Sequence, residues 1–171
     1  MIGVDFSAPF ERLVPGEGFR SRGRTITETD VVSFAALTGD NHPQHTDAEW
    51  SRRSRFGERI AHGMLIVSYA TGLVPFDPDR VVALRRIHNV VFKAPVRLGE
   101  TIHVEGTIAE LTALPGDAGL VRWHWSVRSA ADRLVCRAEV DVLWARESAP
   151  TRDPAAYPAD LIGLPPGVLP C

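Results

Sequence analysis

The second half of the chain alternates between apolar and polar residues with a period of two. The alternation runs through three segments, at residues 101–111, 120–129 and 134–144. This period is typical of β-strands that have one dry face and one wet face. Turn-forming residues separate the segments at 97–100, 114–119 and 130–133. The pattern therefore predicts consecutive antiparallel strands, and residues 85–100 lead into the first of them.

The first half of the chain has the spacing of helices. An apolar stripe follows Thr27 and consists of Val31, Phe34, Ala35 and Leu37. Thr27 and Asp30 have the spacing of an N-terminal capping box, and Gly39 is typical of a residue that ends a helix. These features predict a first helix between Thr27 and Gly39.

Two further helices are predicted before the strands begin. Residues 46–54 predict a short helix that Thr46 or Asp47 caps. Residues 61–74 are apolar nearly all round, so a helix there must be buried on most of its sides. An apolar helix followed by antiparallel strands predicts an α+β fold. In that fold a curved antiparallel sheet wraps around the central buried helix.

Length and composition indicate one globular domain and a tail. The chain has 171 residues, enough for one domain with a sizeable core, which we assign to residues 1–147. Residues 148–171 contain six of the 13 prolines, which predicts an extended C-terminal tail. The net charge of -2 provides no basic field for binding nucleic acid or an anionic membrane.

The cysteines and the chain start favour a reducing compartment. Cys136 and Cys171 do not form a disulfide framework, and we interpret both as free thiols. The first 18 residues lack a basic region followed by an apolar run, which a secretory signal would have. No stretch approaches the roughly 18 apolar residues of a membrane span. We expect a soluble cytoplasmic protein with no membrane partner.

The loop "GDNHPQHTDAEW" at residues 39–50 crowds titratable side chains around a proline. Three interpretations are open from spacing alone. The loop is a helix terminator built from turn-forming residues, or a metal site with the ligands Asp40, His42, His45 and Asp47. In the third interpretation, Asp40 and His45 converge on one small molecule, such as water, for acid–base chemistry.

His62 and Gly63 stand where the apolar helix begins. The first backbone N–H groups of a helix have no partner within it, and the helix dipole adds partial positive charge there. Glycine allows a ligand to approach this backbone closely, so Gly63 is a candidate oxyanion site. Gly63 equally fits close packing of helix on sheet, and His62 fits a packed or hydrogen-bonded residue.

Two segments together resemble the MaoC-like, (R)-specific enoyl-CoA hydratase family. Residues 34–65 resemble its pattern G-D-x-N-P-x-H-x-D followed by I-x-H-G-M-L, and residues 89–108 resemble its F-x-x-P-V-x-x-G-D/E-T segment. The resemblance implies a hot-dog fold and a homodimer or dimer of dimers. It implies a substrate carried as an acyl-CoA or acyl-carrier-protein thioester, with neither a cofactor nor a metal ion.

The resemblance also implies roles for individual residues. Asp40 takes the place of the catalytic aspartate, His45 that of the catalytic histidine, and Gly63 the oxyanion position. The residues implied to contact the substrate are Asn41, His42, His62, Met64 and Thr71. His42 stands where the family has asparagine, with Asn41 one position earlier. Thr71 stands where relatives often have serine.

The implied activity is the reversible hydration of a trans-2-enoyl thioester to an (R)-3-hydroxyacyl thioester. Two alternatives use the same fold. A hot-dog thioesterase would direct the activated water at the carbonyl carbon in place of C3. A non-catalytic acyl-binding subunit would keep the fold and lose the chemistry.

Overall fold

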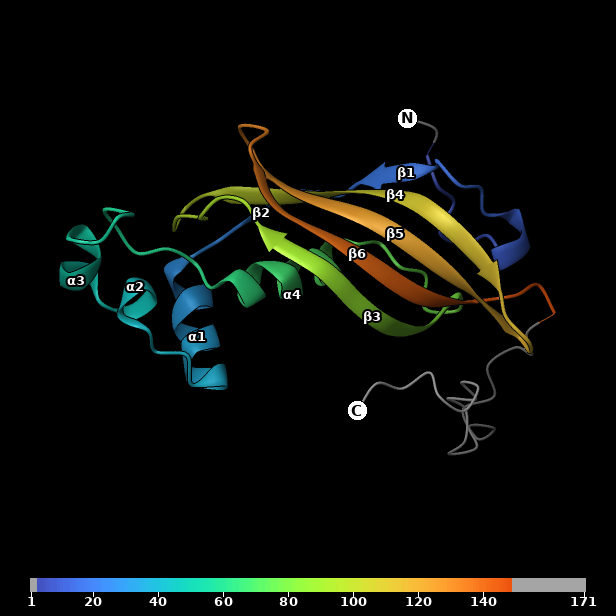
Figure 1. The fold of residues 1–171 in the computed structure, drawn as a ribbon, viewed down its shortest axis with the longest axis horizontal. Helices are drawn as coiled ribbons and strands as arrows, with labels where there is room; N and C mark the ends of the chain where they lie inside the picture. The colour runs from blue at the N-terminus through green and yellow to red at the C-terminus, as the bar shows by residue number, and fades with distance from the viewer. Residues whose placement is uncertain (1–2, 149–171) are drawn as a thin grey trace.

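A computed structural model describes residues 3–148, which form a curved antiparallel sheet with a helix across its concave side (Figure 1). The four long strands are β3 (Val81–Phe92), β4 (Thr101–Ala113), β5 (Ala118–Ser129) and β6 (Leu134–Ala145). The strand order is β1-β4-β5-β6-β3, and β2 also pairs with β4. This architecture confirms the predicted α+β fold. The predicted tail falls outside the described residues, except for its first position.

The strands β4, β5 and β6 form where the period of two predicts them. On β5, Trp123 and Trp125 are buried, whereas His124 between them is exposed. Neighbouring strands pair in antiparallel register, for example Trp123 with Val140 on β6. The inward side chains of β4, β5 and β6 therefore make one continuous apolar face, which closes over the helix.

The first helix, α1 (Glu28–Thr38), has the predicted ends. Thr27 and Asp30 form a capping box, and Gly39 adopts the left-handed conformation at φ 77°. The apolar stripe is wrong at one position, because Leu37 is 83% exposed while Val31 is buried. At about 100° per residue, position 37 lies far around the helix from position 31 and points to solvent.

The short helix predicted over 46–54 is confirmed as α3 (Ala48–Arg52), with Asp47 as its cap. A further short helix, α2 (Pro43–Thr46), precedes it and is not predicted by the sequence. Pro43 starts α2 because its fixed φ suits the first turn of a helix. Asp47 separates the two helices, and its carboxylate accepts a hydrogen bond from the Trp50 N–H, as an N-cap does. Both helices project beyond the end of the sheet (Figure 1).

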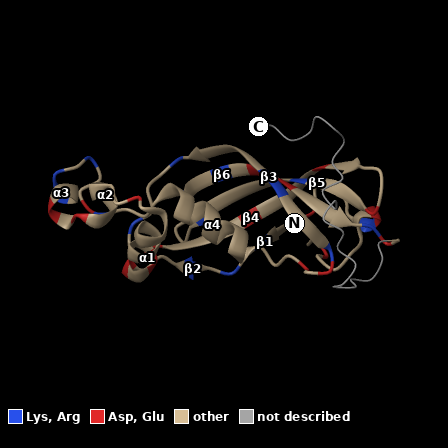
Figure 2. Cartoon of the chain, turned by 90° about the horizontal axis from the view of Figure 1, so that it is seen from below, with Lys and Arg blue, Asp and Glu red and all other residues tan. Residues whose placement is uncertain are grey.

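The apolar helix α4 (Gly63–Leu73) lies across the concave face of the sheet (Figure 2). Its buried residues are Leu65, Ile66, Val67, Ala70 and Leu73. The prediction that the helix is buried on most sides holds only for the side that carries these residues. Met64, Ser68 and Gly72, spaced four residues apart, are exposed because a single sheet covers one side of the helix. No helix within residues 3–148 is both long and apolar enough to cross a membrane.

The N-terminal segment closes the far end of the core. It contains the 3-10 helix η1 (Phe10–Arg12) and the short strands β1 (Gly18–Arg20) and β2 (Arg24–Thr25). Phe6 stacks on Trp123 with ring centroids 5.8 Å apart, and Phe19 meets the same indole edge-on. These aromatic contacts attach the N-terminal segment to the sheet.

The outer face of the sheet carries charged residues, and one of them is fully buried. Asp141 on β6 has no exposed surface. Arg86 on β3 and Arg122 on β5 both donate hydrogen bonds to it, the shortest at 2.7 Å. Burial opposes ionisation of the Asp141 carboxyl, but the hydrogen bonds from the two arginines hold its pKa below the ordinary value. The charge network therefore links the edge strand β3 to the middle of the sheet.

We expect Asp141→Asn to lower the free energy of unfolding at pH 7 by about 2–3 kcal/mol, because it leaves two arginines without their counter-charge. Urea denaturation measures the change. Because the pKa of Asp141 is lower in the folded protein than in the unfolded chain, its ionised form stabilises the fold above about pH 4. This contribution is lost as the pH falls through the pKa of Asp141 in the folded protein. The matched control is Asp132→Asn, whose side chain is 74% exposed. It should change stability by less than about 0.5 kcal/mol, and an equal loss in both variants would contradict the assignment.

Candidate active site

Three segments that are distant in sequence meet at the start of α4. They contribute Asp40 from the loop after α1, His45 from α2 and His62 from the position before α4. One carboxylate oxygen and one nitrogen from each imidazole lie within 4.8 Å of one another. The structure thus brings together the carboxylate, the imidazole and the helix start that the sequence analysis singled out. Three groups at this spacing can in principle share one water molecule or one metal ion.

His45 is buried, with 5% of its surface exposed. Its Nδ1 lies 2.7 Å from the backbone carbonyl oxygen of Ile60. Because a carbonyl only accepts, Nδ1 carries the proton and Nε2 keeps its lone pair. The Gln44 side-chain amide lies 3.2 Å from this Nε2. Burial is the main cause that lowers the pKa of His45 below its ordinary value, which favours the neutral ring.

Asp40 differs from His45 because it is exposed. Its backbone N–H donates to the Thr38 hydroxyl at 3.3 Å, and its carboxylate accepts from the His42 N–H at 3.4 Å. The carboxylate therefore faces both solvent and the buried histidines. This arrangement places an exposed carboxyl group beside a buried imidazole.

His62 connects the two groups. Only 1% of its surface is exposed. Its Nε2–H donates to the backbone carbonyl of Asp40 at 3.0 Å, and its ring stacks on that of His45 with centroids 3.9 Å apart. The sequence favours a packed or hydrogen-bonded His62, or a substrate contact, and the structure places it in the centre of the cluster.

Gly63 is the first residue of α4, and no side chain caps the helix at this end. The early N–H groups of the helix therefore point outward without a side-chain acceptor. A Cβ atom at position 63 would lie 2.8 Å from the ring of Phe92, which is half-exposed at the end of β3. The aromatic ring thus fills the space that any larger residue at 63 would need.

The other predicted contact residues spread outward from this point. His42 caps α2, with its Nδ1 accepting from the Gln44 N–H at 3.2 Å, and its ring centroid lies 6.2 Å from that of His45. Asn41 is exposed and donates from its side chain to the Gly39 carbonyl. Met64 is 57% exposed beside Gly63.

Thr71 is the predicted contact that lies apart from the cluster. It is eight residues along α4 from Gly63, or about 12 Å at the helical rise. Its hydroxyl donates to the carbonyl of Val67 one turn earlier. A group that touches both Asp40 and Thr71 would therefore extend along the helix.

Three participants were missed in the sequence analysis. Phe92 covers Gly63, the Gln44 side-chain amide donates to Nε2 of His45, and the Ile60 carbonyl sets the protonation of its other nitrogen. Phe92 falls within the segment that resembles the family, although nothing in the sequence places it against Gly63. Ile60 contributes only its backbone, so its side chain gives no signal.

The four residues weighed as metal ligands do not converge. Asp47 caps α3 and His42 caps α2, so each of these side chains is engaged in its own helix. Asp40 and His45 meet His62 as the third group. A second cluster of similar spacing, His103, Glu105 and Asp132, lies at the sheet. Arg20 and Arg128 each donate to Glu105 at 3.0 Å, so positive charge already occupies that cluster.

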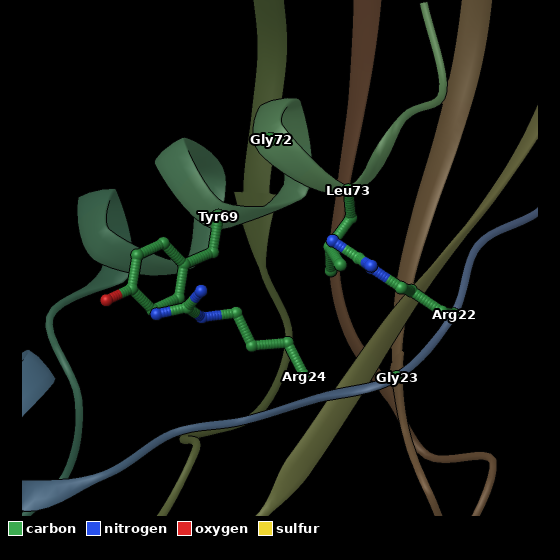
Figure 3. Close-up of a pocket in the computed structure, with 6 residues that line it drawn as sticks. All are labelled: Arg22, Gly23, Arg24, Tyr69, Gly72 and Leu73. Carbon is green, nitrogen blue, oxygen red and sulfur yellow. The ribbon is translucent and has the colours of Figure 1, made fainter.

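A separate hollow of about 330 Å³ opens beside the other half of α4 (Figure 3). It is lined by Arg22, Gly23, Arg24, Tyr69, Gly72 and Leu73. The Arg24 guanidinium lies 3.8 Å from the centre of the Tyr69 ring. Tyr69 is six residues along α4 from Gly63, or about 9 Å. This hollow is therefore distinct from the histidine cluster.

Comparison with known proteins shows what the chain is similar to. The family described as "MaoC like domain" matches residues 11–114. Protein MaoC of Klebsiella aerogenes is 39% identical over 108 residues, which cover 63% of this chain and 32% of that protein. The (R)-specific enoyl-CoA hydratase of Rhodospirillum rubrum is 32% identical over 102 residues, covering 60% of this chain and 70% of the hydratase. The chain thus spans about a third of the first relative and more than two thirds of the second.

Solved structures share the architecture. The unliganded R-hydratase of Pseudomonas aeruginosa superposes with a TM-score of 0.67 at 32% identity, covering 81% of this chain and 86% of that one. A Mycobacterium tuberculosis protein described as a double hotdog fold superposes with a TM-score of 0.74 at 19% identity, covering 91% of this chain and 51% of that one. The sheet wrapped around α4 is therefore a hot-dog fold, as predicted.

We expect Gly63→Ala to destabilise the protein by about 1–2 kcal/mol, because the new methyl group overlaps the Phe92 ring. The cost should shrink when the same change is made in a Phe92→Ala background, where the space is free. Urea denaturation of the wild type, both single variants and the double variant gives the coupling energy. Additive effects, within about 0.5 kcal/mol, would show that the ring does not restrict position 63.

The buried neutral His45 should make stability depend on pH. Its folded pKa lies below the unfolded value, so its contribution is complete above about pH 6.5 and is lost as the pH falls through the folded pKa. We expect the wild type to lose more unfolding free energy between pH 7.5 and 5.5 than His45→Gln does, as measured by urea denaturation. The exposed His124, changed to Gln, should keep the wild-type dependence. If His45→Gln shows the same pH dependence of stability as the wild type, His45 is not its source.

Proposed function

Because the chain belongs to the MaoC-like domain family, we propose that it is an enoyl-thioester hydratase. The proposed reaction adds water across the C2–C3 double bond of a trans-2-enoyl thioester and yields an (R)-3-hydroxyacyl thioester, or runs in reverse as a dehydration. One observation carries the proposal: Asp40, His45 and the start of α4 converge on a space of a few ångströms. The hydratase and R-hydratase names of two relatives support the reaction class.

In the proposed mechanism, Asp40 and His45 hold one water molecule between them. The Nε2 of neutral His45 carries a lone pair, and the exposed carboxylate of Asp40 is a second acceptor. An O–H bond of the water breaks as its oxygen bonds to C3, and the two groups pass a proton to C2. The π electrons move toward the thioester oxygen and return as the C2–H bond forms. The product therefore contains all the atoms of the water molecule and of the enoyl thioester.

The Gly63 N–H is proposed to stabilise the thioester oxygen while it carries negative charge. The uncapped start of α4 favours an anion through its free donors and its dipole. A well-placed donor of this kind contributes about 10²–10³ in rate. The half-exposed Phe92 ring and the neighbouring Met64 would form the wall against which the acyl group lies.

The remaining contacts are assigned to substrate and carrier. His42 and Asn41 would line the mouth of the site, His62 its floor, and Thr71 a more distant part of the acyl path. The carrier is coenzyme A or an acyl carrier protein, whose contacts would supply binding energy away from the reacting bond.

The proposed assembly is a homodimer or a dimer of dimers. The outer edge of β3 has no strand partner among the described residues, and β3 exposes Val82, Leu84 and Phe92. Exposed apolar side chains along an unpaired strand favour pairing with a second copy. The two sheets would then join edge to edge beside the site.

We expect Asp40→Asn and His45→Ala to lower the hydration rate of a crotonyl thioester by at least about 10²-fold, because each removes a proton-transfer group. Loss of absorbance of the conjugated bond measures the rate. The matched controls are Asp132→Asn and His124→Ala, which should keep wild-type rates. Each variant must show a wild-type melting temperature and oligomeric state. Wild-type rates in either site variant would overturn the mechanism.

A thiol reagent in the same reaction separates hydration from thioester hydrolysis. A hydratase consumes the double bond and releases no free thiol, because the bond from sulfur to the carbonyl carbon stays intact. Thiol release at the rate of substrate loss would replace the proposal with the thioesterase alternative.

A further inference from the structure

His62 has contacts that the proposed mechanism leaves unused. Its ring is almost fully buried between the Phe34 ring, with centroids 5.1 Å apart, and the His45 ring at 3.9 Å. Histidine is costly to bury as a purely apolar filler because its nitrogens need hydrogen-bond partners. The position therefore needs an explanation in terms of what the two nitrogens and the ring do.

The first contact ties the Asp40 loop to α4. The His62 Nε2–H donates to the Asp40 carbonyl at 3.0 Å across 22 positions of sequence. The other hydrogen bonds of Asp40 within residues 3–148 go to Thr38 and His42, each two positions away. Local bonds shape the loop, but they do not place it relative to the rest of the site. The bond from His62 does so.

The second contact holds His45. The two rings are 3.9 Å apart and inclined by 27°, so the plane of His62 supports the plane of His45. The Ile60 carbonyl holds Nδ1 of His45 from the side. Together these contacts orient the Nε2 lone pair and leave little rotation to the ring.

The second nitrogen of His62 indicates its tautomer. Nδ1 is buried and has no hydrogen-bond partner within the described residues. A proton there would be buried without an acceptor, against a second imidazole and at the positive end of α4. These surroundings favour the tautomer with its proton on Nε2, which is the nitrogen that donates to Asp40.

We propose that His62 is the positioning residue of this site, which fixes Asp40 through its Nε2–H and His45 through its ring. The inference rests on the proposed function for its effect on rate, and on geometry alone for the tautomer of His62. It gives His62 a role separate from touching the substrate.

Two variants test the two contacts. His62→Phe keeps an aromatic ring on His45 and removes the donor to Asp40. His62→Gln keeps a donor near the position of Nε2 and removes the ring. We expect His62→Phe to lower kcat for crotonyl-thioester hydration by about 10–100-fold, because small misplacements of reacting groups have effects of this size. KM should stay within about threefold, and His62→Gln should recover several-fold of the lost kcat.

His103→Phe is the matched control. His103 is also buried, at 5% exposed, and its Nε2 also lacks a hydrogen-bond partner among the described residues, but it lies on β4. It should keep kcat within about twofold. A loss equal to that of His62→Phe would show that removing any buried imidazole is enough and would overturn the proposal. Thermal melts must show all three variants folded.

Nitrogen NMR of histidine-labelled protein gives a readout that needs no activity. We expect neutral His62 to show the Nε2–H tautomer, because its Nε2 faces the backbone carbonyl of Asp40. If the wild type hydrates no thioester, the proposed function fails and these spectra still decide the role of His62. A proton on Nδ1 of neutral His62, or no recovery in His62→Gln, would overturn it.

Discussion

The packing of α4 against the concave face of the sheet is the constraint on which the site depends. Leu65, Ile66 and Ala70 are buried there, and burying a leucine or isoleucine side chain contributes roughly 1.5–3 kcal/mol. This packing fixes α4 relative to the sheet, and it fixes the first residue of the helix, Gly63, in the same way. The loops that carry Asp40 and His45 are arranged around that residue, through His62 and the carbonyl of Ile60.

The two groups proposed to act on water differ in their exposure to solvent. His45 is buried and its pKa is lowered, chiefly by that burial, so its neutral ring offers a lone pair. Asp40 is exposed, and water can solvate its carboxylate. One fold thus places a buried imidazole beside an exposed carboxyl group, and in the proposed mechanism a water molecule between them carries the proton.

The described chain leaves two apolar surfaces uncovered near the site. Met64 on α4 is 57% exposed and Phe92 on β3 is 50% exposed. The Phe92 ring also lies directly on Gly63. A long acyl group and a second copy of the chain would each cover such surface. The partner in the proposed dimer and the proposed substrate would therefore contact the same region, where β3 ends and α4 begins.

The sequence by itself determined the class of fold and most of its long elements. A period of two, a capped helix and an apolar helix each depend on neighbours in the chain, so β4–β6, α1 and α4 could be predicted from local spacing. The motif around Asp40, His45 and Gly63 likewise identified the candidate chemistry. Tertiary structure alone decided that Phe92 lies on Gly63, that Asp141 is buried by two arginines, and that His62 joins the loop to the helix. These contacts link residues 19 to 55 positions apart, and no local pattern encodes them because they exist only once the sheet has curved around α4.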